Sequence, residues 1–333
     1  MKIIYLINNS SKTSVPISWA NYIKNNFKKI SIELCSIKQF KMKNLQSIFR
    51  ADIVHGHHIK AMYLFIMFNF IFNKKTVYTV HGSYLYLSDQ NKKLLKYIFD
   101  KSDKIVFVNQ YLYDVLPDTM KKLIKNKYQV VLNGVDTAFK YDKIDIYEKY
   151  NLKVSNTIIF HPARFVKEKN HLSVIEAFKK VSLENRDVKL VLAGDGLLRK
   201  SIEEKIEQLE LSEKVVLLGL IDKNDVYNFL ENCEVFIMPS ISEGLNIAFL
   251  EAMTMKTKIL VSDIEQFTYP FKHYGLNPQE YNTYFTNPND IESIYKSFKM
   301  VLEADKYDNF DMNIFSLDSM LKKYQSIYLE LIK

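Results

Sequence analysis

Two glutamates stand eight residues apart in the segment from Glu234 to Val261, and their side chains could bind hydroxyl groups. The segment reads EVFIMPSISEGLNIAFLEAMTMKTKILV, and the two glutamates are Glu243 and Glu251. An ionised carboxylate is only a hydrogen-bond acceptor, so the pair suits the hydroxyl groups of a sugar or a ribose. Because exposed glutamates are common, a loop charge at Glu243 and a solvated helix position at Glu251 are the alternative interpretation.

A strand, a loop and a helix are expected to position these glutamates. Residues 235–238 and 258–261 are short apolar runs bounded by turn residues, which is typical of buried strands in a parallel sheet. Between them we expect a loop over 239–244 and a helix over 246–255. The start of that helix, at Gly244 to Asn246, would present free backbone N–H groups and a favourable dipole to a phosphate. Together these features predict a site for a nucleotide sugar.

Two cations follow another expected strand, at residues 157–160. Arg164 and Lys169 stand five residues apart in the segment HPARFVKEKNH, where that strand would lead into a helix. Ligands of open parallel sheets bind outside the carboxyl ends of the strands, so the two cations could clamp a diphosphate. Arginine would supply the bidentate contact. A solvated basic turn is the alternative.

Histidines and glycines stand at the ends of other expected strands. His81 ends the strand of VYTVHG, where it could hydrogen-bond a sugar hydroxyl or stabilise a developing charge. The run HGHH at residues 55–58 has no carboxylate or cysteine at ligand spacing, so we expect no metal site there. Gly194 lies in LAGDG at a sharp turn after a strand, where glycine lets the backbone approach a ligand closely.

The whole chain alternates short apolar runs with longer amphipathic or polar segments, which predicts a doubly wound parallel α/β fold. A polar stretch at residues 133–156 interrupts the alternation, which restarts at residue 157. We therefore expect two Rossmann-like domains, residues 1–150 and 151–315. Residues 316–333 form a final amphipathic helix that is expected to pack on the first domain. The expected strands cover residues 3–7, 31–36, 52–55, 76–80, 104–108, 129–132, 157–160, 189–192, 214–217, 234–238 and 258–261.

Composition and charge narrow the class of protein. With 333 residues, 47% hydrophobic and 25% charged, the chain is typical of a soluble protein with two domains. We expect no signal peptide, and the longest apolar run, residues 61–72, is too short to span a bilayer. Cys35 and Cys233 lack the spacing of a disulfide framework or a metal site. These features predict a cytoplasmic protein.

The net charge of +8 is concentrated in the first half of the chain. Residues 1–150 hold 24 Lys and Arg against 11 Asp and Glu, whereas the remainder holds 22 against 27. A basic half favours an anionic partner such as a membrane surface, although a general abundance of lysine is the alternative. Because no recognised nucleic-acid-binding motif is present, we expect no nucleic-acid partner.

Taken in order, the motifs resemble those of the retaining glycosyltransferases of family 4, which have the GT-B fold. The resemblance implies two Rossmann-like domains with a cleft between them. Two features depart from the family: the first loop, NNSSKTS, has no glycine, and TMKTK replaces a small residue and a glycine after the second glutamate. The matching segments are DIVHGHH, TVHG, LNGVD, ARFVKEKN, LAGDG, VVLLG, SISEGLNIAFLEAM and NPNDI.

The resemblance also implies roles for individual residues. Glu243 would bind the donor sugar, Glu251 the ribose, and Arg164 and Lys169 the diphosphate. The imidazole of His81 would lie near the donor sugar, and His81, Arg164, Lys169 and Glu243 would be the catalytic residues. No metal ion is expected. Further donor contacts would come from Gly194, Gly244, Leu245, Asn246 and Ile247.

The expected activity is the retaining transfer of a hexosyl or N-acetylhexosaminyl group from a UDP- or GDP-sugar. The acceptor would be a saccharide, in particular a lipid-linked one, in surface polysaccharide or glycan biosynthesis. In this hypothesis the protein is cytoplasmic and makes peripheral contact with the inner face of the cell membrane. Two alternatives stay open: a nucleotide-sugar epimerase, which would form product without an acceptor, and a non-catalytic GT-B partner subunit, which would lack donor-site residues.

Overall fold

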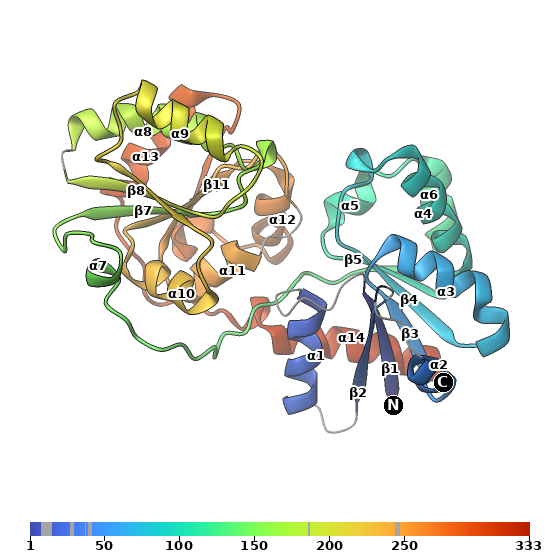
Figure 1. Cartoon of the computed structure of the whole chain (residues 1–333). Helices are drawn as coiled ribbons and strands as arrows, with labels where there is room; N and C mark the ends of the chain where they lie inside the picture. The colour runs from blue at the N-terminus through green and yellow to red at the C-terminus, as the bar shows by residue number, and fades with distance from the viewer. Residues whose placement is uncertain (8–14, 27–29, 37, 39–41, 186, 244–246) are drawn as a thin grey trace. The chain divides into compact units, whose positions relative to one another are not determined.

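The chain forms two compact units (Figure 1). Unit 1 consists of Met1–Gly134 and Leu317–Lys333, and unit 2 consists of Val135–Ser316. The chain therefore leaves unit 1 at Gly134 and returns to it at Leu317. This computed structural model describes residues 1–7, 15–26, 30–36, 38, 42–185, 187–243 and 247–333.

The division at Gly134 differs from the predicted boundary at residue 150, and hydrogen bonds explain the difference. The backbone N–H of Asp142 donates to Asn224 Oδ1 at 2.6 Å, and Asp142 O accepts from Nδ2 of Asn224 and Asn228 at 2.9 and 2.8 Å. Both asparagines lie on α10 (Lys223–Asn232). The polar segment that resembled a linker is thus tied to unit 2.

Among its described residues, unit 1 contains one sheet of six parallel strands in the order β2-β1-β3-β4-β5-β6. Ile3 and Tyr5 belong to one core cluster and Ile4 and Leu6 to another. The division follows from strand geometry, because successive side chains point to opposite faces of a sheet. The strands are β1 (Lys2–Ile7), β2 (Ser31–Ser36), β3 (Ile53–Gly56), β4 (Lys75–Val80), β5 (Lys104–Phe107) and β6 (Tyr128–Val130).

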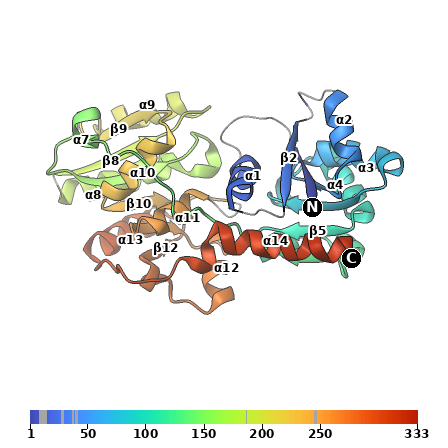
Figure 2. The same cartoon turned by 90° about the horizontal axis from the view of Figure 1, so that it is seen from below.

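Helices cover both faces of this sheet. One face packs against α1 (Val15–Asn26) and α14 (Leu317–Ile332), which lie side by side (Figure 2). The buried residues of α14 recur every three or four positions, including Leu317, Leu321 and Tyr324, as the apolar face of an amphipathic helix requires. The other face is covered by α2 (Met42–Phe49), α3 (Ile59–Phe72), α4 (Asp89–Lys101), α5 (Gln110–Asp114) and α6 (Asp118–Ile124).

Buried hydrogen bonds attach α14 to the strands beneath it. The Tyr328 hydroxyl lies 2.7 Å from His55 Nδ1 and 3.1 Å from the Tyr5 hydroxyl, and the other ring nitrogen of His55 lies 2.7 Å from Thr79 Oγ1. The Tyr324 hydroxyl lies 3.1 Å from the same Thr79 oxygen. Because a buried polar group without a partner is costly, this network fixes the position of the helix as well as covering the core.

Unit 2 has the same architecture in its described residues, with six parallel strands in the order β12-β11-β10-β7-β8-β9. Helices α8 (His171–Glu184) and α13 (Ile291–Glu303) pack side by side, as Figure 1 shows. Strand β12 (Thr283–Thr286) was not predicted, because its sequence, TYFT, is not a run of apolar residues. The other strands are β7 (Thr157–Pro162), β8 (Val188–Ala193), β9 (Val215–Gly219), β10 (Val235–Met238) and β11 (Lys258–Ser262).

The remaining helices of unit 2 lie before β7 or in the segments that connect the strands. Helix α11 is described from Ile247, and α12 contains Pro270 after its first turn. Their bounds are α7 (Ile146–Lys149), α9 (Arg199–Gln208), α11 (Ile247–Thr254) and α12 (Glu265–Tyr274).

Acid is expected to destabilise this fold through its buried histidines. Burial lowers the pKa of His81 to about 4 and holds the pKa values of His55 and His57 well below 6.5. Unfolded histidines bind protons as the pH falls through about 6.5, whereas the folded ones do not. The contribution of these histidines to stability is therefore fully present above pH 6.5 and is lost as the pH falls, for His81 between pH 6.5 and 4. For His81 alone, the free energy of unfolding should fall by about 2 kcal/mol between pH 7 and pH 5.

Urea unfolding at the two pH values measures this loss. The variant His81→Asn should show a smaller loss than the wild type. His273→Asn, which changes an exposed histidine on α12, is the matched control and should show the wild-type loss. Equal unfolding free energies at both pH values would contradict the assignment of neutral, buried histidines.

Candidate functional site

The strand order of unit 2 brings two loops with candidate residues together. Strands β7 and β10 are neighbours, although three helices and two strands separate them in the chain. The order of a doubly wound sheet reverses at such a position, and ligands bind there, outside the carboxyl ends of the strands. Lys169 follows β7 and Glu243 follows β10, so both lie at this reversal point.

Lys169 and Glu243 form an ion pair that is shielded from solvent. The Lys169 ammonium contacts Glu243 Oε1, and their side chains are only 13% and 7% exposed. Neighbouring residues hold the two loops together, because Asn170 Nδ2 donates to Pro239 O at 3.1 Å and to Pro288 O at 2.7 Å. A solvated basic turn and a free loop charge, the alternatives at the sequence level, do not describe these side chains.

Glu251 is the second buried carboxylate. It lies on α11, is 6% exposed, and accepts from Lys223 Nζ at 2.8 Å. Burial and the negative charge of Glu251 raise the pKa of Tyr227, which lies on α10 with Lys223. The Lys223 ammonium also lies over the rings of Tyr227 and Phe139, at 5.5 and 5.0 Å from their centroids. Sequence reasoning missed Lys223 and Tyr227, since nothing in their spacing relates α10 to Glu251.

Gly194 lies against the backbone of the residue that precedes Arg164. Arg164 is exposed and lies two residues after the end of β7. At Gly194 the φ angle is +153°, and a Cβ atom there would lie 2.0 Å from the carbonyl oxygen of Ala163. Only glycine permits this approach. The residue close to Gly194 is therefore the one that precedes Arg164, which gives Gly194 a role in positioning the loop that carries this arginine.

Part of the predicted phosphate site cannot be placed. Gly244, Leu245 and Asn246 lie outside the described residues. Ile247 is the first described residue of α11.

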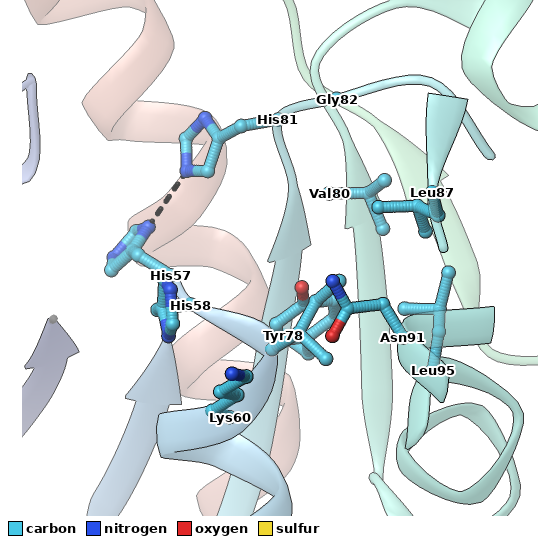
Figure 3. A pocket seen from close by; sticks show the side chains of 11 residues that line it. His57, His58, Lys60, Tyr78, Val80, His81, Gly82, Leu87, Asn91 and Leu95 are labelled. Atoms are coloured by element: carbon cyan, nitrogen blue, oxygen red, sulfur yellow. Dashed lines mark hydrogen bonds between the residues drawn. The ribbon is translucent and has the colours of Figure 1, made fainter. Parts of the chain in front are cut away.

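In unit 1 the predicted histidine lies in a pocket. The cavity has a volume of about 280 Å³ at the carboxyl ends of β3 and β4 (Figure 3). Its wall combines polar side chains, including His57, His58, Lys60 and Asn91, with apolar residues of β4 and α4. Nδ1 of His57 lies 3.0 Å from Nε2 of His81, as the dashed line in Figure 3 marks. At the sequence level the run HGHH was considered only as a metal site and His57 and His58 were given no role, although their position at the end of a strand was a signal.

The histidines of this pocket are uncharged at neutral pH. Burial lowers the pKa of His81 to about 4, and burial together with His55 and His81 lowers the pKa of His57 well below its usual value. A neutral imidazole exchanges hydrogen bonds with hydroxyl groups but carries no positive charge. Nε2 of His57 and Nδ1 of His58 are buried without a hydrogen-bond partner among the described residues. The pocket thus has the chemistry of a site for hydroxyl groups.

Known protein families match most of the chain. Residues 142–314 match the model of glycosyl transferases group 1, and residues 26–139 match that of glycosyltransferase family 4. A glycosyltransferase of Methanocaldococcus jannaschii is 26% identical over 78% of this chain, and the match spans 64% of that protein's own length. An Escherichia coli UDP-Gal:alpha-D-GlcNAc-diphosphoundecaprenol alpha-1,3-galactosyltransferase is 26% identical over 87% of this chain, and the match spans 80% of that protein's length.

Solved structures share the fold. The structure of Anabaena HepE with UDP and glucose has a TM-score of 0.78 and 16% identity, covering 99% of this chain and 100% of that one. A Rickettsia africae glycosyltransferase has a TM-score of 0.76 and 20% identity, and the match covers 100% of this chain and 98% of that one. The predicted α/β fold with two Rossmann-like domains of the GT-B type is confirmed. With both family models matched in order, the chain belongs to glycosyl transferases group 1 and is a glycosyltransferase, as the resemblance to family 4 implied.

Proposed function

We propose that the protein transfers a sugar from a nucleoside diphosphate sugar to a lipid-linked saccharide, with retention of the anomeric configuration. The observation that carries the proposal is the shielded Lys169–Glu243 pair at the reversal point of the second sheet. Two similar proteins support the acceptor class, since their names specify diphosphoundecaprenol-linked acceptors. The UDP and glucose in the HepE complex support a nucleotide-sugar donor, UDP- or GDP-linked.

In this proposal the cation of the resting ion pair becomes a ligand of the donor. Lys169 would exchange Glu243 for the donor diphosphate, and Arg164 would add a bidentate contact. Glu243, released from the lysine, would accept hydrogen bonds from hydroxyl groups of the sugar. A cation fixed in a shielded site stabilises the charge that develops on a leaving diphosphate.

The reaction would proceed by front-face displacement. The bond between the anomeric carbon and the diphosphate oxygen breaks, and the acceptor oxygen forms its bond on the same face of the sugar. The proton of the acceptor hydroxyl moves to the departing diphosphate, so the products are a nucleoside diphosphate and a glycoside. No metal ion takes part in the proposed steps. His81 keeps its proposed role as a neutral group that hydrogen-bonds a sugar hydroxyl.

Glu251 is proposed to bind the ribose of the donor. Its carboxylate is buried, and Lys223 holds one of its oxygens. A carboxylate has acceptor sites for several donors, so ribose hydroxyls can bind while the lysine contact persists. For the whole protein we propose a cytoplasmic location with peripheral contact to the inner membrane face, for which the basic first half provides the attraction.

Loss of the Glu251 carboxylate should weaken nucleotide binding. In Glu251→Ala the ribose loses charge-assisted hydrogen bonds, so we expect the Kd of UDP or GDP to rise about tenfold or more. Isothermal titration calorimetry with both nucleotides measures the change. The control is Glu176→Ala, which removes the partner of Lys205 from a 2.8 Å ion pair elsewhere in unit 2. Equal affinities in wild type and Glu251→Ala would refute the ribose role.

Loss of the Lys169 charge should slow the reaction itself. We expect donor hydrolysis by Lys169→Ala to be about 100-fold slower or more, since a fixed electrostatic contact to the leaving group is lost. The assay follows release of the nucleoside diphosphate, and circular dichroism checks the fold because Glu243 loses its partner. Lys167→Ala, which changes an exposed lysine of the same turn, should retain the wild-type rate. A folded Lys169→Ala protein with the wild-type rate would rule out this assignment.

A further inference from the structure

Helix α3 is apolar on all sides, yet half of it faces solvent. Its sequence, IKAMYLFIMFNFIF, contains one charged residue, Lys60. A helix that is hydrophobic all round is normally buried in a protein core or a membrane. Here one side packs in the core through Ala61, Met62, Phe65 and Ile66. The exposed side carries Leu64, Met67, Phe68, Phe70 and Ile71, which are 46%, 43%, 51%, 81% and 53% exposed.

These exposed residues form one continuous apolar surface with Phe49. Leu64, Met67, Phe68 and Ile71 follow the spacing of a single helix face. Phe49 of α2 is 55% exposed, and its ring lies 4.9 Å from that of Phe72. We call the surface made by Phe49, Leu64, Met67, Phe68, Phe70 and Ile71 the α3 patch. Exposed apolar surfaces of this kind mark sites of interaction with proteins or membranes.

Basic residues border the α3 patch. Lys74 donates from Nζ to the carbonyl oxygen of Phe49 at 2.8 Å, and Arg50 and Lys75 are exposed beside these residues in the chain. One of these cations, Lys75, has an acidic neighbour, Asp103, at 3.7 Å. Residues 1–75 as a whole hold 12 Lys and Arg against 2 Asp and Glu. The patch therefore combines an apolar centre with a positively charged border.

We propose that the α3 patch inserts into the headgroup region of an anionic bilayer. Apolar side chains flanked by lysine and arginine are the features of helices that lie in the membrane interface. The fourteen residues of α3 span about 21 Å, less than the roughly 30 Å of a hydrocarbon core. Within the described part of the chain, no helix is long and apolar enough to cross a membrane. The helix would thus lie along the bilayer surface.

A second copy of the chain fits the α3 patch less well. A two-fold symmetric contact would bring the same surface of both copies together, including the basic border. Like charges placed opposite one another oppose association, whereas an anionic lipid surface attracts them. The inference deepens the proposed function and rests on it for its purpose, which is to bring the enzyme to a lipid-linked acceptor.

Flotation of the full chain with lipid vesicles tests the inference. We expect the wild type to bind vesicles of phosphatidylcholine with phosphatidylglycerol, and to bind more weakly in high salt or without the anionic lipid. The double variant Phe68→Ser and Ile71→Ser should bind vesicles at least about tenfold more weakly, because two inserted apolar side chains are lost. The matched control changes Leu329 and Ile332 of α14 to serine. Both are 44% exposed and three residues apart, and binding should not change.

A fluorescent variant gives a second measurement on a minimally altered helix. Phe70→Trp places an indole at the most exposed position of the α3 patch, and Trp19, 1% exposed in the core, is an internal reference. Brominated lipids quench an indole that they contact. We expect quenching of Phe70→Trp on anionic vesicles and none of the wild type. This variant decides the question if circular dichroism shows that the double serine variant does not fold.

Three outcomes would overturn the inference. The first is an unchanged affinity of the folded double serine variant for vesicles. The second is absence of binding by the wild type; UDP binding that still depends on Glu251 would then leave the proposed transferase function intact. The third is a wild type that forms dimers in sedimentation and does not bind vesicles, together with a monomeric double variant. That result would assign the patch to a second copy of the chain.

Discussion

An ion pair between Lys169 and Glu243 bridges the two loops at the reversal point of the second sheet, and the candidate site depends on it. Leaving either charge unpaired in a shielded position would cost several kcal/mol, so each side chain needs the other until a ligand takes its place. Parallel strands produce this juxtaposition by topology, since their carboxyl ends meet at one edge. The resting site thus holds a cation and a carboxylate, the two groups that are proposed to contact the diphosphate and the sugar after they separate.

The candidate sites of the two units hold different kinds of polar group. In unit 2 the carboxylates of Glu243 and Glu251 are shielded and paired with lysines. In the unit 1 pocket His57 and His81 are uncharged, and next to them the two ring nitrogens of His55 lie within hydrogen-bond distance of the Tyr328 and Thr79 hydroxyl groups. The difference matches the chemistry proposed for each, because a diphosphate demands fixed charges. Saccharide hydroxyl groups are recognised by neutral donors and acceptors.

The sequence predicted the fold and the candidate residues that follow strands. It did not predict contacts between distant elements, which only tertiary packing creates. Glu243 and Lys169 were found because position after a buried strand is a local signal. Lys223 was missed because it reaches Glu251 from another helix, at no characteristic spacing. The polar segment before residue 150 reads as a linker, and only its hydrogen bonds to α10 show that it belongs to unit 2. The apolar character of α3 was visible in the sequence, but its exposure required the structure.

Proton NMR of donor hydrolysis tests the central claim, retaining chemistry on a nucleoside diphosphate sugar, most directly. The protein is incubated with α-linked UDP- and GDP-sugars, and the anomeric signals of the released sugar are followed from the first minutes, before mutarotation mixes them. The account predicts that the α-anomer forms first, and that Lys169→Ala releases it far more slowly. Initial formation of the β-anomer would contradict the retaining mechanism, and absence of hydrolysis with every donor would contradict the proposed enzyme activity.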